Sequence, residues 1–103
     1  MRQFDVFENP SRRSRPIAPY IVVLQSHLLA AAPTVVAAPL IRDDRRSNYS
    51  AISVVASFRG ESFIVVIPEL AALDPILLRR PIGNLREHED AIRRALDRLF
   101  TGF

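Results

Sequence analysis

Residues 51–67 read Ala-Ile-Ser-Val-Val-Ala-Ser-Phe-Arg-Gly-Glu-Ser-Phe-Ile-Val-Val-Ile, two apolar runs separated by Arg59-Gly60. Apolar residues recur at every second position in each run, which is the spacing of a β-strand with one face in a core. Gly60 tolerates a positive φ, and a two-residue connection of this kind favours a tight antiparallel hairpin. The segment therefore predicts strands at 51–58 and 61–67 within an antiparallel β-sheet.

Three further β-branched or alternating segments precede this hairpin, at residues 3–7, 20–25 and 34–41. The eight prolines all lie in the first four-fifths of the chain, and Pro39 interrupts the third of these segments. Because proline is unfavourable in helix interiors and in central strands, we expect short strands and loops over residues 3–80. Short strands joined by turns predict a mainly β fold, a meander closed into a small barrel or half-barrel.

The C-terminal segment contains no proline and predicts one α-helix over residues 85–101. Asn84 is placed to cap its start, and Glu87, three residues later, completes a capping box. Gly102 is placed to end the helix in the left-handed conformation. Apolar residues recur at intervals of three or four, which predicts that one face packs on the sheet. This stripe comprises Leu85, His88, Ile92, Ala95, Leu96, Leu99 and Phe103.

The length of 103 residues and the hydrophobic fraction of 49% predict a single globular domain, residues 1–103. Cysteine is absent, which excludes disulfides, thiolate nucleophiles and cysteine-ligated zinc. No apolar run is long enough to cross a membrane and the first residues lack a signal peptide, so we expect a cytoplasmic protein without membrane contact. The net charge is +3, and all 14 basic residues are arginines, which bind carboxylates and phosphates through two parallel hydrogen bonds.

No motif with a dependable catalytic or metal-binding mechanism is present. A glycine-rich phosphate loop and a pair of histidines at helical spacing are both missing from the sequence. The two histidines, His27 and His88, are expected to have structural roles, because a metal site would need further ligands nearby. Asp43 and Asp44 are expected to pair with neighbouring arginines rather than to hold a cation. We therefore predict no catalytic residue, no metal and no cofactor.

Three arginines, Arg12, Arg13 and Arg15, lie together in a turn-rich segment near the N-terminus. They are suited to bind RNA phosphate groups, with Tyr20 or Tyr49 stacking on a base. A solvated loop explains the same residues more simply. Both interpretations stay open, and the solvated loop is favoured.

The last residues are Leu99-Phe100-Thr101-Gly102-Phe103, which end on an aromatic side chain without a polar tail. An exposed phenylalanine at a terminus is unfavourable unless it packs against something. Phe103 is therefore expected either to fold back onto its own barrel or to lie at a subunit interface or on a partner.

Six segments spread over the whole chain carry a family resemblance. They are Gln-Phe-Asp-Val-Phe (3–7), Val-Leu-Gln-Ser-His-Leu-Leu (23–29), Val-Val-Ala-Ala-Pro-Leu (35–40), Gly-Glu-Ser-Phe (60–63), Leu-Arg-Glu-His-Glu-Asp-Ala-Ile (85–92) and Leu-Phe-Thr-Gly-Phe (99–103). In order, spacing and total length they resemble the CcdB family, the toxins of type II toxin–antitoxin modules. The resemblance implies an SH3-like barrel of antiparallel strands, with a small accessory sheet and one C-terminal helix.

The resemblance also implies a function and partners. Family members are homodimers that enter the cavity formed by the A subunits of DNA gyrase and trap the enzyme after DNA cleavage, which serves plasmid maintenance. They bind gyrase through their last three residues, which implies a gyrase-binding site at Thr101, Gly102 and Phe103, supported by Leu99 and Phe100. A cognate CcdA-like antitoxin neutralises the toxin through an acidic disordered tail. Nucleic acid is then contacted only indirectly, through gyrase and the antitoxin.

One position of this implied site departs from the family pattern. The best-known member ends in Trp-Gly-Ile, and the tryptophans of its two subunits stack on an arginine of gyrase. Thr101 has no π face, so a cation–π contribution of about 0.5–2 kcal/mol per contact is missing at this position. Gly102 is retained, and Phe100 or Phe103 offers an aromatic surface from a different position.

Two alternative functions remain open from the sequence. An endoribonuclease toxin of the MazF/Kid kind has the same barrel, and Arg12, Arg13, Arg15 and His27 are its candidate residues for acid–base chemistry on RNA. A non-toxic CcdB-like relative, kept for autoregulation with its antitoxin, is supported by Thr101 in place of tryptophan.

Overall fold

The fold is a curled antiparallel β-sheet with an α-helix packed against it. The computed structural model describes residues 1–26, 28, 31–44 and 52–102 of the chain. Its strands and α-helix are β1 (Asp5–Glu8), β2 (Tyr20–Val23), β3 (Val35–Arg42), β4 (Val54–Phe58), β5 (Glu61–Val65), β6 (Ala71–Leu73), β7 (Gly83–Asn84) and α1 (Glu89–Thr101). Short 3-10 helices connect the later elements: η2 (Ile67–Glu69), η3 (Pro75–Leu77) and η4 (Arg86–His88).

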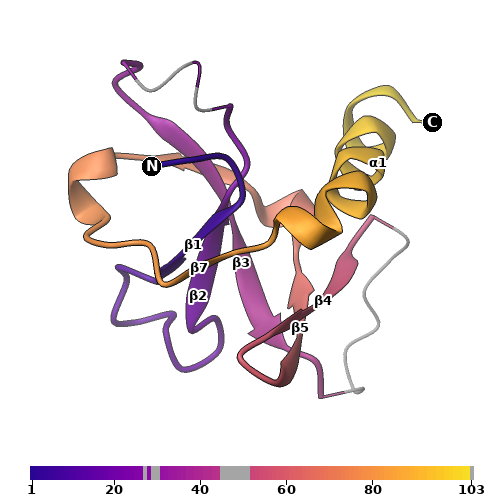
Figure 1. Cartoon of the computed structure of the whole chain (residues 1–103), viewed down its shortest axis with the longest axis horizontal. Coiled ribbons are helices and arrows are strands. Elements are labelled where there is room, and N and C mark those ends of the chain that lie inside the picture. The colour runs from indigo at the N-terminus through magenta and orange to yellow at the C-terminus, as the bar shows by residue number, and fades with distance from the viewer. Residues whose placement is uncertain (27, 29–30, 45–51, 103) are drawn as a thin grey trace.

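In the described part of the chain, seven strands form one sheet in the order β4-β5-β3-β2-β1-β7, with β6 as a branch. The second half of β3 pairs with β5 and its first half pairs with β6, so β3 belongs to both parts of the sheet. The sheet curls into a half-barrel with α1 beside it (Figure 1). The predicted fold class, a mainly β small barrel with a C-terminal helix, is confirmed. Its accessory part is the β6 branch.

The hairpin between β4 and β5 is built as predicted. Phe58 pairs with Glu61, which leaves Arg59 and Gly60 as the two-residue turn. Both turn residues have a positive φ, 53° and 77°, as a type I′ turn requires. Alternate residues of β4 are buried and exposed, which confirms the period-two prediction for this strand. β5 ends at Val65 rather than at the predicted residue 67, and its last three residues are all buried because both of its faces are covered. β4 begins at Val54, and the predicted first residue, 51, lies outside the described residues.

Pro39 lies inside β3, a central strand, and the expectation that it interrupts this segment is wrong. The register of β3 with β5 places Val66 opposite Pro39, one residue beyond the last paired residue of β5. The carbonyl oxygen of Pro39 accepts from the Val66 N–H at 3.0 Å. The missing N–H of Pro39 faces the same way. The proline therefore removes one hydrogen bond at the end of the β3–β5 ladder. At this point β3 no longer pairs with β5 and does not yet pair with β6.

The curl brings β4 and β7, the two ends of the strand order, into contact. The ring of Phe58 packs directly on Gly83, where a Cβ atom would lie 3.0 Å from the ring Cζ and closer still to Cε1. The same ring meets Tyr20 and Phe63 edge-on, with centroid distances of 5.2 and 6.4 Å. Because the ring is fixed by these neighbours, only glycine at position 83 lets the half-barrel close around it.

The main core fills the inner face of the half-barrel and includes the helix. Its buried side chains come from every part of the fold, from Phe4 before β1 to Ala95 in α1. Leu85 and Ile92, which lie before and within α1, are at most 1% exposed. A smaller cluster around Phe7 lies elsewhere on the sheet. The helix is thus held by the same core that holds the strands.

The C-terminal helix starts later than predicted. The side chain of Asn84 accepts from the Arg86 N–H at 2.6 Å, as a cap would, but its amide group donates to Asp5 Oδ1 at 2.9 Å. This contact holds Asn84 in β7, paired with β1, so the chain first forms the 3-10 helix η4. The predicted capping box of Asn84 and Glu87 is wrong, because α1 has His88 at its N-cap and no side-chain cap.

The predicted apolar stripe of the helix is confirmed as far as Leu99, and its last member, Phe103, lies outside the described residues. Ile92 is fully buried, and Leu96 and Leu99 are partly buried against the main core. On the outer face Glu89 and Arg93 lie 3.5 Å apart, acid before base. In the described part of the chain, no helix combines the length and the apolar character needed to span a bilayer.

Candidate functional site

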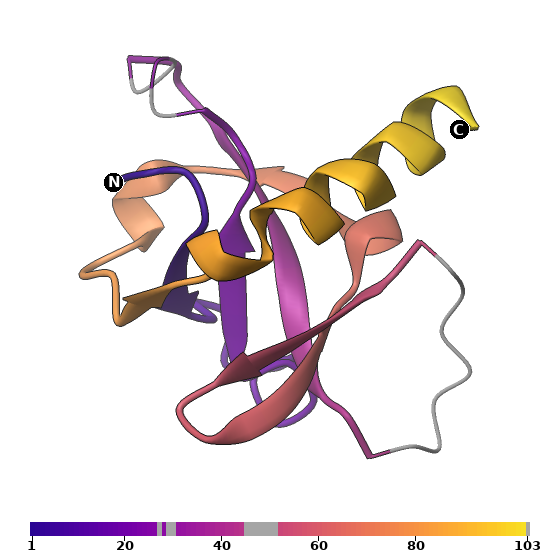
Figure 2. The same cartoon turned by 45° about the vertical axis from the view of Figure 1, so that its right-hand side comes forward.

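The end of α1, residues 99–102, is the first candidate site, and we name it the helix tip. The main core holds the helix as far as Leu99, and the last turn extends beyond the strands (Figure 2). Phe100 is 70% exposed, and Thr101 and Gly102 are also exposed. A large apolar side chain therefore projects into solvent at the end of the helix. Its exposure to water is unfavourable in the isolated protein, and a partner that covered it would remove this cost.

Two polar groups of the helix tip, the Gly102 N–H and the Thr101 hydroxyl, are bonded within the helix. Gly102 has a φ of 79°, and its N–H donates to the Arg98 carbonyl at 3.0 Å, so its predicted role in ending the helix is confirmed. The Thr101 hydroxyl donates to the Asp97 carbonyl at 2.6 Å. The tip consequently offers a partner the ring of Phe100, the methyl group of Thr101 and the bare backbone of Gly102.

Four of the five residues predicted for the gyrase-binding site lie on this one turn. Leu99 faces the core, whereas Phe100, predicted only as support, is the largest exposed apolar side chain of the tip. Thr101 and Gly102 complete the turn. Phe103 lies outside the described residues, so neither placement expected for it is tested.

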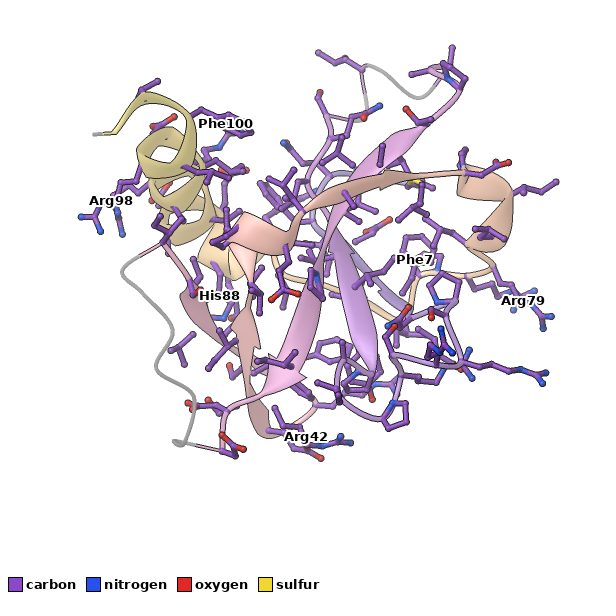
Figure 3. All side chains as sticks on the ribbon, turned by 180° about the vertical axis from the view of Figure 1, so that it is seen from behind. Phe7, Arg42, Arg79, His88, Arg98 and Phe100 are labelled. Carbon is purple, nitrogen blue, oxygen red and sulfur yellow. The ribbon has the colours of Figure 1, made fainter. Side chains whose placement is uncertain are left out.

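A second candidate site is a cleft between the loop that follows β1 and the segment between η3 and β7. Its volume is about 580 Å³. Figure 3 shows Arg79 and Phe7, which both line this cleft, on the side of the molecule away from Phe100. We name it the arginine cleft, because its cationic lining consists of Arg12, Arg15, Arg79 and Arg80.

The loop that forms one wall of the arginine cleft is tied down by Asn9. This side chain is 6% exposed, and its amide group donates to the Ala18 carbonyl at 2.8 Å and to Ser14 Oγ at 2.9 Å. Arg15 Nε donates to the Asn9 carbonyl at 2.9 Å, and its guanidinium lies 3.1 Å from Glu8. The favoured prediction of a merely solvated loop is therefore incomplete, because buried hydrogen bonds shape this loop.

Sequence reasoning predicts half of the cationic lining. Arg12 and Arg15 belong to the arginine group singled out in the sequence, while Arg13 does not line the cleft. Arg79 and Arg80 were not predicted, because only the fold brings them to the N-terminal loop. Their one signal in the sequence is that they are consecutive charges within an otherwise apolar, proline-flanked segment.

The histidine and aspartate residues provide no metal site in the part of the chain that the structure describes. His88 is partly buried, and its Nε2 accepts from the Ser57 N–H at 3.4 Å, which is a structural contact. Asp43 accepts from Ser62 Oγ at 3.2 Å. No group of three histidine, cysteine or acidic residues is placed to hold a metal ion among the described residues, and His27 lies outside them.

Tyr20, one of the two predicted stacking residues, is partly buried against the main core. Its ring lies edge-on to Phe58 and Phe63, at centroid distances of 5.2 and 5.4 Å. Tyr49, the other predicted stacking residue, lies outside the described residues. The packing of Tyr20 against the core therefore gives no support to the ribonuclease hypothesis. The role proposed for His27 in that hypothesis is untested.

The curled antiparallel sheet and the C-terminal helix define a small, mainly β protein. A family model described as CcdB protein matches residues 3–102, nearly the whole chain. The chain belongs to the CcdB family and is thus a toxin of the toxin–antitoxin type. Comparison with curated proteins gives no match.

Proposed function

We propose that this chain poisons DNA gyrase: a homodimer presents its two helix tips to the A subunits of gyrase and holds the enzyme on cleaved DNA. The observation that carries the proposal is the helix tip, where Phe100 is 70% exposed on a helix fixed by the main core. Family membership over residues 3–102 supports the same target.

The proposed mechanism needs no catalytic group. A protein that binds the cleaved state of gyrase more tightly than the resealed state raises the population of the cleaved state. The chain's contribution is to present the tip in a fixed orientation, so that little conformational freedom is lost on binding. Ile92, fully buried, and Leu99, packed on the main core, hold the helix while Phe100 stays outside.

The proposed partners include an antitoxin as well as gyrase. A chain with a net charge of +3 attracts an acidic, disordered segment that folds on binding. Gyrase and a DNA-binding antitoxin are both cytoplasmic, and we propose the same compartment for this protein.

A DNA-cleavage assay with gyrase from the same host tests the proposal. The purified chain is expected to convert supercoiled plasmid into linear DNA that is released on denaturation. Phe100→Ala is expected to lower this activity about tenfold or more, because burial of a phenylalanine contributes about 1.5–3 kcal/mol. Val55→Ala is the matched control, since Val55 is 62% exposed on β4 and is not part of the helix tip, so its loss should leave cleavage unchanged.

Thr101→Trp separates the active toxin from the non-toxic relative. A tryptophan at this position restores a stacking surface, and a gain of about 0.5–2 kcal/mol per contact is expected in gyrase binding. If the natural chain leaves no cleaved DNA and Thr101→Trp does, the chain is a non-toxic relative. If neither the natural chain nor the Thr101→Trp variant yields cleaved DNA, even at a higher concentration, the gyrase proposal is abandoned.

A further inference from the structure

The arginine cleft holds the positive excess of the molecule. Its lining contains four arginines and one carboxylate, that of Glu8, which gives a formal charge of +3. The net formal charge of the entire chain is also +3. The charged residues outside the cleft therefore balance one another in number, and the excess charge lies at one concave surface.

Three of the four guanidinium groups are available to a ligand. The guanidinium of Arg15 is engaged by the carboxylate of Glu8 at 3.1 Å. By contrast, Arg12, Arg79 and Arg80 are exposed, and they form no ion pair in the part of the chain that the structure describes. Guanidinium groups without a carboxylate partner bind anionic oxygens through paired N–H donors.

Both walls of the cleft are fixed by backbone hydrogen bonds. The Asn9 N–H donates to the Pro19 carbonyl at 3.0 Å, which holds the start of the loop that carries Arg12. On the other wall, the Ile82 N–H donates to the Val6 carbonyl at 2.8 Å, close behind the two consecutive arginines. The backbone of the site is therefore in place before a ligand arrives, so binding costs little ordering of the chain.

The volume and the lining of the cleft favour a small ligand that is recognised by charge. The volume of about 580 Å³ lies within the range of small-molecule pockets, about 300–1,000 Å³. Phe7 is the aromatic residue of the lining, but it is 3% exposed and offers no open ring face for a base to stack on. Recognition therefore depends on the guanidinium groups.

A chain of phosphoryl groups meets this requirement better than a set of carboxylates. Each phosphoryl group carries negative charge and exposes several acceptor oxygens, and neighbouring groups in a polyphosphate share a bridging oxygen. Carboxylates of an organic acid or a peptide are separated by several carbon atoms. A triphosphate thus brings more negative charge into the same small volume.

We propose that the arginine cleft binds the phosphate chain of a small polyphosphate anion, inorganic triphosphate or the triphosphate group of a nucleotide. Arg12, Arg79 and Arg80 contact phosphoryl oxygens, and a nucleoside attached to the chain stays in solvent. This inference goes beyond the proposed function, because the cleft lies on the side of the molecule away from Phe100 (Figure 3).

Isothermal titration calorimetry on the full chain tests the inference with inorganic triphosphate, at low salt and without magnesium. Binding of one triphosphate per chain is expected. ATP is expected to bind within about threefold of triphosphate, because the base adds no stacking contact. AMP, with one phosphoryl group, and citrate, with carboxylates only, are expected to bind about tenfold more weakly or less.

Matched variants assign this binding to the cleft. The double variant R79Q/R80Q is expected to weaken triphosphate binding about tenfold, because two charge-assisted contacts are lost, and R12Q on the other wall about threefold. R13Q removes an exposed arginine of the same loop that does not line the cleft, and should change affinity by less than about twofold. All of these variants should unfold at the same urea concentration as the natural chain, since the substituted side chains are exposed.

Four outcomes would overturn the inference. They are no binding of triphosphate at low salt, equal losses in R13Q and R79Q/R80Q, ATP that binds more than tenfold tighter than triphosphate, or an oligothymidine of similar charge that binds more tightly than triphosphate. The third outcome would assign the cleft to nucleotide bases, and the fourth to nucleic acid. R79Q/R80Q should still trap cleaved DNA with gyrase, so the cleft and the helix tip are tested separately.

Discussion

The helix tip and the arginine cleft lie on opposite sides of one small core and are built in opposite ways. The tip projects, is apolar, and comes from a single turn of helix fixed by buried residues behind it. The cleft is concave and cationic, and it joins two segments from opposite ends of the chain. One surface is therefore a product of local periodicity, whereas the other exists only once the sheet has formed.

The two surfaces should also respond differently to salt. Contacts of exposed arginines are screened as the Debye length falls from about 10 Å at 0.1 M to about 3 Å at 1 M salt. Burial of the Phe100 ring is an apolar contribution that salt does not weaken. Ionic strength therefore separates a ligand held by the arginine cleft from a partner held by the helix tip. Four variants test this difference. Their expected effects on the free energy of unfolding decrease from a buried residue behind the helix tip to an exposed residue of the arginine cleft.

Ile92→Ala should have the largest effect, because it removes the anchor that the helix tip shares with the sheet. The side chain is fully buried in the main core, so a loss of about 2–5 kcal/mol in the free energy of unfolding is expected. Urea unfolding measures it, with Arg94→Ala on the outer face of the helix as a control within about 0.5 kcal/mol. A loss below about 1 kcal/mol would mean that the tip is not anchored in the main core.

Gly83→Ala should disturb the closure of the half-barrel next to the arginine cleft. The new Cβ would overlap the fixed ring of Phe58, at an expected cost of about 1–3 kcal/mol in the free energy of unfolding. In a Phe58→Leu background the same substitution should cost less, because the obstructing ring is gone. Additive losses in this double-mutant cycle would contradict direct packing of Phe58 on Gly83.

Gly102→Ala should weaken only the helix tip. A side chain at a φ of 79° costs about 1 kcal/mol, although nothing lies within 4 Å of the new Cβ. Thermal unfolding and gyrase trapping should both decline slightly, while triphosphate binding at the arginine cleft should stay the same. A change in triphosphate affinity would show that the two surfaces are coupled.

Glu8→Gln should have the smallest effect on stability and act only on the arginine cleft. The exposed Glu8–Arg15 pair contributes about 0–1 kcal/mol, so unfolding should hardly change. Removal of the one carboxylate in the lining should instead raise the affinity for inorganic triphosphate about twofold. Weaker triphosphate binding in this variant would indicate that Glu8 orders Arg15 for the ligand.

Local patterns in the sequence predict the parts of the fold that local forces determine. The two-residue turn, the alternation of β4 and the apolar stripe of α1 each depend on neighbours a few residues away, and each is confirmed. Gly102 ends the helix for the same reason, because its role depends only on its own φ.

The wrong or missing predictions concern residues whose partners are distant in sequence. Asn84 does not cap α1 because its pairing with Asp5 holds it in β7, ahead of η4 and of the first residue of α1, Glu89. Pro39 is tolerated in β3 because of where β5 ends. The sequence singles out Arg12 and Arg15 but does not predict the arginine cleft, because only the fold brings Arg79 and Arg80 to the N-terminal loop. A single sequence does not reveal such long-range pairings.

The packing of distant segments into one core also constrains when the fold can form during synthesis. Phe4 packs in the same cluster as Leu85, Ile92 and Ala95, which are synthesised much later. A nascent or prematurely terminated polypeptide lacks these late members, so its barrel stays incomplete. A polypeptide cut short before Leu85 therefore has neither a complete core nor a helix tip.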